Sequence, residues 1–156
     1  MFLLNLLFAL TWVALTGQFG PLDLAFGFAL GFGLLWLARG QIGGERYFEK
    51  GPVVVRFVLY ILWEIIVANL NVARTVLFTP RAKLRPGIIA VPLDVTSDVE
   101  ITMLANIITL TPGTLSLDVS DDRKVLYVHA IDVDDPDTFR QSIKGGLERA
   151  VRGVFA

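Results

Sequence analysis

Residues 53–78 have the sequence VVVRFVLYILWEIIVANLNVARTVLF, in which polar residues recur at helical spacing. At 100° per residue they form a stripe about 80° wide, made of Arg56, Tyr60, Glu64, Asn71 and Arg74. Apart from Asn69 and Thr75, the remaining arc is aliphatic or aromatic. Charged side chains are costly in lipid, so the stripe must face water, headgroups or protein. The pattern predicts a long amphipathic helix that lies along a membrane surface or packs against partner helices.

The chain before this helix is strongly apolar. No charge occurs before Asp23, and the turn-forming residues 16–21 divide the apolar stretch into pieces at about 1–16 and 22–38. Each piece is at the short end of the length that spans a bilayer, so we expect a transmembrane helical hairpin. It has no basic n-region and no A-x-A site, so we expect no cleavage. Gly27 and Gly31 form a G-x-x-x-G pattern, which either admits a close helix or reflects the ordinary glycine content of membrane helices.

Two basic clusters flank the third helix. The clusters are Arg39, Arg46 and Lys50 in the expected loop 39–52, and Arg81, Lys83 and Arg85 after residue 78. A third helix that crossed the bilayer would put them on opposite sides, against the positive-inside rule. We therefore favour two spans with the third helix in the membrane plane and a cytoplasmic C-terminal domain. Three spans are the alternative.

Composition limits the function. The 156 residues are 54% hydrophobic and 19% charged, with a net charge of −1, so a nucleic-acid partner is not indicated. The absence of cysteine excludes disulfides and thiolate metal sites, and the single histidine excludes a multi-histidine metal site. We find no nucleophile with a base, no phosphate loop and no dinucleotide motif. We expect a protein that is not an enzyme and has no cofactor.

The second half of the chain predicts a small domain. After a linker at 79–87, residues 88–156 suggest a strand at 88–91, a helix from the Ser97–Glu100 capping box to Leu110, strands at 115–119 and 125–133, and a helix after Asp135. The expected order is β-α-β-β-α, a three-stranded mixed sheet with two helices on one face. The other face would need a membrane or another chain. The apolar circumference of the 98–110 helix predicts a further partner, and the last helix is expected to expose Glu148 on its charged side. The fold class is therefore membrane α plus α+β, with residues 1–78 as the membrane region.

Three candidate sites arise from single residues. Glu64, with Arg56 and Arg74 on the same stripe, could relay protons or shape an ion path; the alternative, which we favour, is that it solvates the polar face or pairs with a partner. His129 is expected to be structural rather than a proton carrier. The aspartates lack the glycine and final glutamate of an EF-hand loop, so we expect no metal site. They are Asp118, Asp121, Asp122, Asp132, Asp134, Asp135 and Asp137.

Three segments together resemble a known family: LANIITLTPGT at 104–114, DVSDD at 118–122 and VHAIDV at 128–133. They are similar to the E subunit of the multisubunit cation/proton antiporters called Mrp, Mnh or Pha. The segments NLNVAR at 69–74 and RPG at 85–87 also resemble that subunit. The resemblance implies a bacterial inner-membrane assembly of six or seven subunits that exchanges cytoplasmic Na⁺ or K⁺ for external protons. Its large subunits, similar to those of respiratory complex I, would carry the proton path, and the E subunit would be accessory.

The family-like sequence Thr111-Pro112-Gly113-Thr114, with Asn106 five residues earlier, ends a helix and turns the chain into a strand. We expect it to shape the fold and a docking surface. The leading hypothesis is an assembly subunit that contacts other antiporter subunits and the lipid bilayer. The alternative is an ion-path component in which Glu64 titrates, and a self-sufficient channel is disfavoured because one short hairpin leaves little room for an aqueous path.

Overall fold

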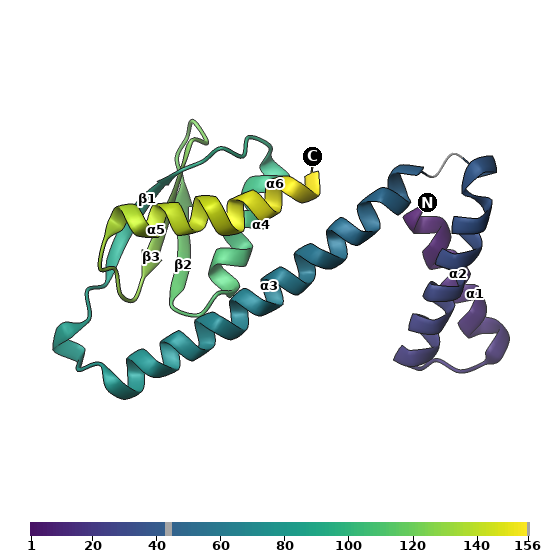
Figure 1. Cartoon of the computed structure of the whole chain (residues 1–156), viewed down its shortest axis with the longest axis horizontal. Coiled ribbons are helices and arrows are strands. Elements are labelled where there is room, and N and C mark those ends of the chain that lie inside the picture. Colours follow the sequence, from purple (N-terminus) through teal and green to yellow (C-terminus); the bar gives the residue numbers. More distant parts are fainter. Residues whose placement is uncertain (43–44, 156) are drawn as a thin grey trace. The chain divides into compact units, whose positions relative to one another are not determined.

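A computed structural model describes residues 1–42 and 45–155 (Figure 1). The chain divides into two compact units, Met1–Pro52 and Val53–Ala156, and each is described by itself.

In the first unit, α1 (Phe2–Thr16) and α2 (Pro21–Ile42) form the expected hairpin. Gly17 closes α1 in the left-handed conformation, with φ of 69°, and its N–H donates to the Val13 carbonyl. The G-x-x-x-G pattern packs α2 against α1: a Cβ on Gly27 would lie 2.8 Å from Trp12 Cβ, and one on Gly31 would overlap the Asn5 side chain. The close helix that these glycines admit therefore belongs to the same chain.

The expected loop at 39–52 is wrong, because α2 continues to Ile42 and α3 already begins at Glu45. Pro52 lies inside α3, which ends at Phe78. An interior proline removes one backbone hydrogen bond and costs about 3 kcal/mol, and the long apolar helix that follows outweighs this cost. The tyrosine and phenylalanine at 47 and 48 also pack on Phe32 of α2, which favours the helical start.

Among the residues that the structure describes, two helical segments are long and apolar enough to cross a membrane. They are Pro21–Gln41, with mean hydropathy 1.6, and Tyr47–Phe78, with mean hydropathy 2.0. The 15 residues of α1 give a helix of about 22 Å, shorter than a typical hydrocarbon core of about 30 Å. The 34 residues of α3 give about 51 Å, well beyond that thickness.

The second unit contains the rest of α3 and the small domain. After the short η1 (Arg81–Lys83), the order is β1 (Gly87–Pro92), α4 (Asp98–Leu110), β2 (Thr114–Val119) and β3 (Val125–Ala130). The C-terminal helical segment is continuous and consists of α5 (Pro136–Ser142), the π-helical η2 (Ile143–Glu148) and α6 (Arg149–Phe155). The capping box at Ser97 is confirmed.

The sheet is antiparallel throughout, so the expectation of a mixed sheet is wrong. The strand order is β1-β3-β2, and both neighbouring pairs are antiparallel. The helix α4 returns the chain so that β2 has the same direction as β1, but β3 inserts between them. The central position expected for the strand that starts at Val125 is confirmed, although β3 ends at Ala130 rather than at 133.

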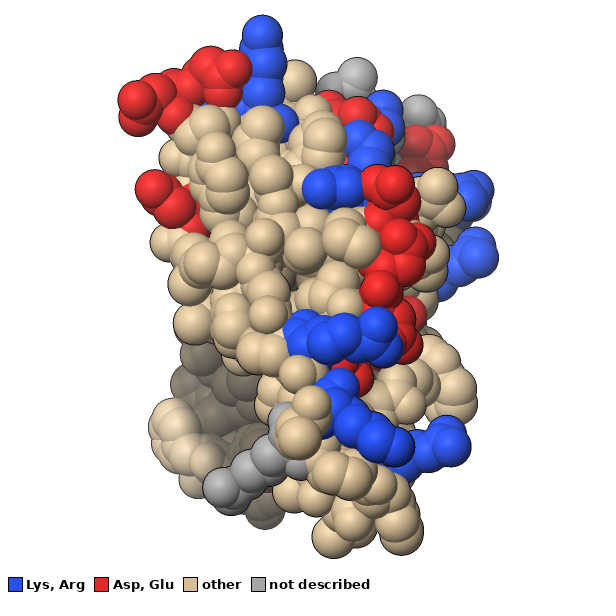
Figure 2. Space-filling model, turned by 90° about the vertical axis from the view of Figure 1, so that its left-hand side faces the viewer, with Lys and Arg blue, Asp and Glu red and all other residues tan. Residues whose placement is uncertain are grey.

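The core lies on one face of the sheet, where α4 and the C-terminal helical segment both pack, as expected. Its buried members come from β1, β3, α4, η2 and α6, with Val95 from the loop after β1. They are Ile89, Val91, Val95, Ile101, Leu104, Ile107, Ile108, Leu126, Val128, Ile143, Leu147 and Val151. The opposite face of the sheet carries exposed Ile88, Leu115 and Tyr127. Figure 2 shows a broad uncharged area on the side of the sheet, bordered by bands of acidic and basic side chains.

Candidate functional site

The part of α3 from residue 53 onward uses two opposite faces. Phe57, Tyr60 and Ile61 pack against the domain core, and Val72 reaches the turn after α4. The other face is apolar and exposed, with Val55, Val58, Leu59, Leu62, Trp63, Ile66, Leu70, Val76 and Leu77. The side chain of Asn69, the one polar residue there, donates to the Ile65 carbonyl at 2.7 Å. One face of α3 therefore packs on the folded domain, and the opposite face is an exposed apolar surface of the kind that binds lipid or another protein.

The polar stripe does not gather into one ionic site. Glu64 is half-buried, whereas Arg56 and Arg74 are exposed. Helical rise separates Glu64 from them by about 12 and 15 Å along the axis. Among the residues that the structure describes, neither arginine pairs with Glu64. A role for Glu64 in transport stays a prediction.

The turn after α4 is held by its own hydroxyl groups. The Thr111 hydroxyl donates to the Ile107 carbonyl at 2.9 Å, and the Thr114 hydroxyl donates to the Ile108 carbonyl at 2.7 Å. These bonds satisfy carbonyls that the end of a helix leaves free. Gly113 has φ of 93°, and a Cβ there would lie 2.9 Å from Val72 Cγ2 of α3. Within the chain this turn therefore meets α3 and also Ile131, whose N–H donates to the Gly113 carbonyl at 2.9 Å.

Asn106 lies on the outer side of α4 and is exposed. It lines a shallow depression together with Val99, Thr102 and Met103. Ile107, which also lines the depression, belongs to the core. Val99 and Leu110 remain exposed, so α4 buries one face rather than most of its circumference. A second partner for α4 stays a prediction.

The acidic residues serve several separate turns. Asp135 caps α5, Asp134 pairs with Arg85, and Asp122 accepts a bond from Ser120 Oγ. The hydroxyl and backbone bonds from Thr138 hold the pKa of Asp135 below its usual value. The described residues hold no group of three acidic or histidine side chains that could bind a metal.

His129 is the penultimate residue of β3, lies on the open face of the sheet and is half-buried. Its register partners are Ile88 on β1 and Leu115 on β2, so its cross-strand neighbours are aliphatic. A structural role for His129 stays a prediction.

The expectation of an exposed Glu148 is wrong, because its side chain is only 1% exposed. Its Oε1 accepts hydrogen bonds from the backbone N–H groups of Asp94 at 2.6 Å and Val95 at 3.0 Å. The π-helical turn that ends at Glu148 changes the phase of the helix, which a pattern of 3.6 residues per turn could not anticipate. Lys144 joins this cluster by donating to the Pro92 carbonyl and to Asp94, and its bond to Asp94 lowers the pKa of that carboxyl.

Comparisons with known proteins agree with this architecture. A family model described as MNHE, a Na⁺/H⁺ ion antiporter subunit, matches residues 5–154. The chain is 36% identical over 152 residues to the E subunit of the Na⁺/H⁺ antiporter of Alkalihalophilus pseudofirmus, covering 97% of this chain and 96% of the relative. The corresponding antiporter protein of Bacillus subtilis gives the same identity and coverage.

Among solved structures, the chain is similar to a chain of the membrane-bound sulfane sulfur reductase, an archaeal respiratory membrane complex. The two are 28% identical, with a TM-score of 0.61, over 98% of this chain and 97% of that one. The sequence match runs through both the apolar helices and the small domain. The chain therefore belongs to the MnhE family of Na⁺/H⁺ antiporter subunits, which are membrane proteins.

Proposed function

We propose that this chain is an accessory, assembly-type subunit of a multisubunit antiporter that exchanges cytoplasmic Na⁺ or K⁺ for external H⁺. The observation that carries this proposal is that the chain exposes many apolar side chains, while its charged side chains are largely used within its own domain. Apolar side chains stay exposed on the helices and on the open face of the sheet, whereas many charged side chains of the domain bind its own turns and helix ends. Such a chain has surface for partners and little chemistry of its own.

The relatives support assembly with other subunits. They are named as subunits of Na⁺/H⁺ antiporters, and the similar solved chain belongs to a respiratory membrane complex. Its partners would be the large subunits that resemble those of complex I, together with the small membrane subunits.

For the topology, we propose that the hairpin spans the bilayer, that α3 lies in the membrane plane, and that the domain is cytoplasmic. The packing of α3 against the domain from Phe57 to Val72 supports this, because a helix covered along this length by a water-facing domain is poorly suited to cross lipid. Trp36 and Arg39 support an interface at the end of α2, where the guanidinium carbon lies 4.5 Å from the ring centroid.

Cysteine labelling tests this topology, because the native chain has no cysteine and therefore no background. Lys50→Cys and Lys83→Cys flank the greater part of α3. A membrane-impermeant maleimide should label both from the cytoplasmic side of inverted vesicles and neither from the periplasmic side of cells. Labelling from opposite sides would mean that α3 spans the bilayer and would overturn the in-plane proposal.

Purification of the tagged chain from its native membrane, followed by mass spectrometry, tests the assembly role. Large antiporter-like subunits should co-purify, and recovery of the chain alone would contradict the proposal.

Glu64→Gln separates the accessory role from a proton path. We expect an intact complex with an unchanged pH profile of antiport; an intact complex with a shifted profile would instead assign Glu64 to the path.

A further inference from the structure

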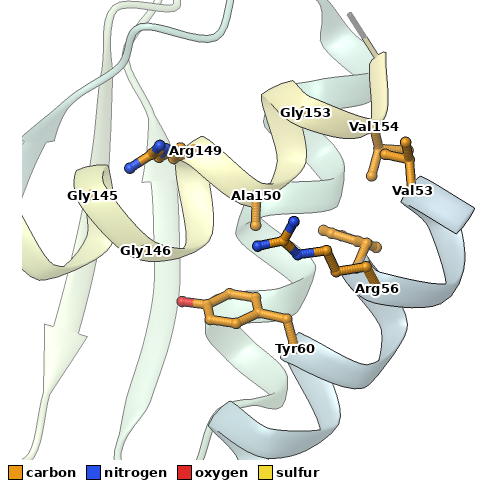
Figure 3. Close-up of a pocket in the computed structure, with 10 residues that line it drawn as sticks. Val53, Arg56, Tyr60, Gly145, Gly146, Arg149, Ala150, Gly153 and Val154 are labelled. Atoms are coloured by element: carbon orange, nitrogen blue, oxygen red, sulfur yellow. The ribbon is translucent and has the colours of Figure 1, made fainter.

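A cleft of about 520 Å³ opens between α3 and the C-terminal helical segment, both within the second unit (Figure 3). One wall is the 53–60 part of α3, and the other is formed by η2 and α6. The lining consists of Val53, Arg56, Phe57, Tyr60, Gly145, Gly146, Arg149, Ala150, Gly153 and Val154. These ten residues include two arginines and no acidic residue, so the cleft suits an anionic ligand with an apolar part.

Glycines keep the cleft open on the side of the C-terminal segment. A Cβ on Gly145 or Gly153 would meet no atom within 4 Å, so these positions border free space. At Gly146, by contrast, a Cβ would lie 2.9 Å from the Tyr60 hydroxyl oxygen, so the absent side chain lets this hydroxyl approach the π-helical turn. π-helical turns are frequent at functional sites.

The two arginines stand on different walls and are both exposed. In Figure 3 the Arg56 side chain reaches from α3 toward Ala150, above the Tyr60 ring. Among the described residues, neither Arg56 nor Arg149 pairs with a carboxylate, whereas Arg85, Arg123 and Arg140 each pair with an aspartate. Unpaired guanidinium groups are suited to bind phosphate, because their N–H donors match its oxygens.

We propose that this cleft binds an anionic phospholipid. Arg56 and Arg149 bind the phosphate-bearing headgroup, and an acyl chain follows Phe57 and Val53. The inference rests on the proposed position of α3 at the membrane surface. Val53 of the lining and its neighbour Val54 are exposed on α3, and they provide the apolar surface along which an acyl chain would run. A bound lipid would thus fix the domain to the membrane at the start of the packed part of α3.

Native mass spectrometry of the full chain, purified in detergent and supplied with phosphatidylglycerol or phosphatidylcholine, tests the proposal. We expect preferential retention of phosphatidylglycerol, reduced at least about fivefold by Arg56→Gln or by Arg149→Gln. Arg152→Gln is the matched control, because it removes the same charge from α6 outside the lining. Equal retention of both lipids, or an equal loss in the control, would overturn the proposal.

Gly153→Leu provides a second variant that fills the cleft without changing charge. Since nothing lies within 4 Å of a Cβ there, the variant should fold and should lose phosphatidylglycerol. Undiminished retention would place the lipid elsewhere and contradict the proposal. Saturable binding of inorganic phosphate that displaces the lipid completely would assign the cleft to a free anion instead.

Co-purification of partner subunits separates this inference from the proposed function. The cleft variants should still recover the antiporter subunits, because the cleft is not the proposed contact with them. Loss of the lipid with partners retained supports the cleft, whereas unchanged lipid retention with partners retained overturns the cleft alone. Failure of the unsubstituted chain to recover any partner would overturn the assembly role instead.

Discussion

Glu148→Ala is expected to loosen the loop between β1 and α4. The carboxylate Oε1 accepts the backbone N–H groups of Asp94 and Val95, and the side chain is almost fully buried. Removing the acceptor leaves the buried N–H of Val95 and the partly buried N–H of Asp94 without a partner, and each unpaired buried donor costs about 1–3 kcal/mol. Relief of the buried charge offsets part of this loss, so we expect a net destabilisation of about 3 kcal/mol.

Hydrogen–deuterium exchange of the full chain in detergent measures this effect where it arises. At about 1.4 kcal/mol per factor of ten, the amides of Asp94 and Val95 should exchange about 100-fold faster in Glu148→Ala. Glu148→Gln keeps one acceptor oxygen and loses only the charge assistance, so its loss should be about 1 kcal/mol. Asp121→Ala, an exposed turn substitution, is the control. If Glu148→Ala exchanged at these two amides no faster than the control, the carboxylate would not hold the loop.

Three further predictions concern single positions. Gly31→Leu should prevent α1 and α2 from packing and lower the amount of protein in the membrane on immunoblots, while Gly33→Leu, where a Cβ meets no atom within 4 Å, should not. Gly113→Ala combines a φ of 93° with a close approach to α3 and should lower the stability of the domain by about 1–3 kcal/mol in thermal unfolding, unlike Gly87→Ala. The pKa of Asp135 lies below its usual 3.8, chiefly because the Thr138 hydroxyl donates to the carboxylate. The contribution of this carboxylate to the folding stability is therefore present above pH 3.8 and is lost as the pH falls through the folded pKa. Asp135→Asn keeps the helix cap and should flatten the fall of the thermal midpoint below about pH 4; an unchanged slope would contradict this.

Local patterns predicted much of the fold because local interactions decide it. The Ser97 capping box, the turn at Gly17 and the central strand after residue 124 each depend on neighbouring residues or on alternation along the chain. The antiparallel sheet could not be inferred in the same way. It depends on which strand inserts between the other two, and strand order is a property of tertiary packing.

The candidate site was less predictable than the fold. Periodicity located the polar stripe of α3, but the centre of the face that packs on the domain lies about 70° further round the helix, near Phe57 and Ala68. Glu148 was missed because a constant helical period puts it on the charged side. The adjacent Gly145-Gly146 pair was the available signal, since two glycines weaken an α-helix and admit a π-turn.

The two faces of α3 make the orientation of the domain depend on helix phase. The close approaches at Tyr60 and Val72, 12 residues and about 120° apart round the helix, lie at the two edges of the packed face and fix the rotation of α3 against the domain. Because that rotation is fixed, the exposed apolar arc that includes Leu62 and Ile66 can point in only one direction relative to the sheet. A membrane that takes up this arc therefore also determines which way the open face of the sheet points, and a partner that binds that face meets it in a defined orientation. In this arrangement α3 fixes the orientation of the domain before a partner binds, which lowers the entropic cost of that binding.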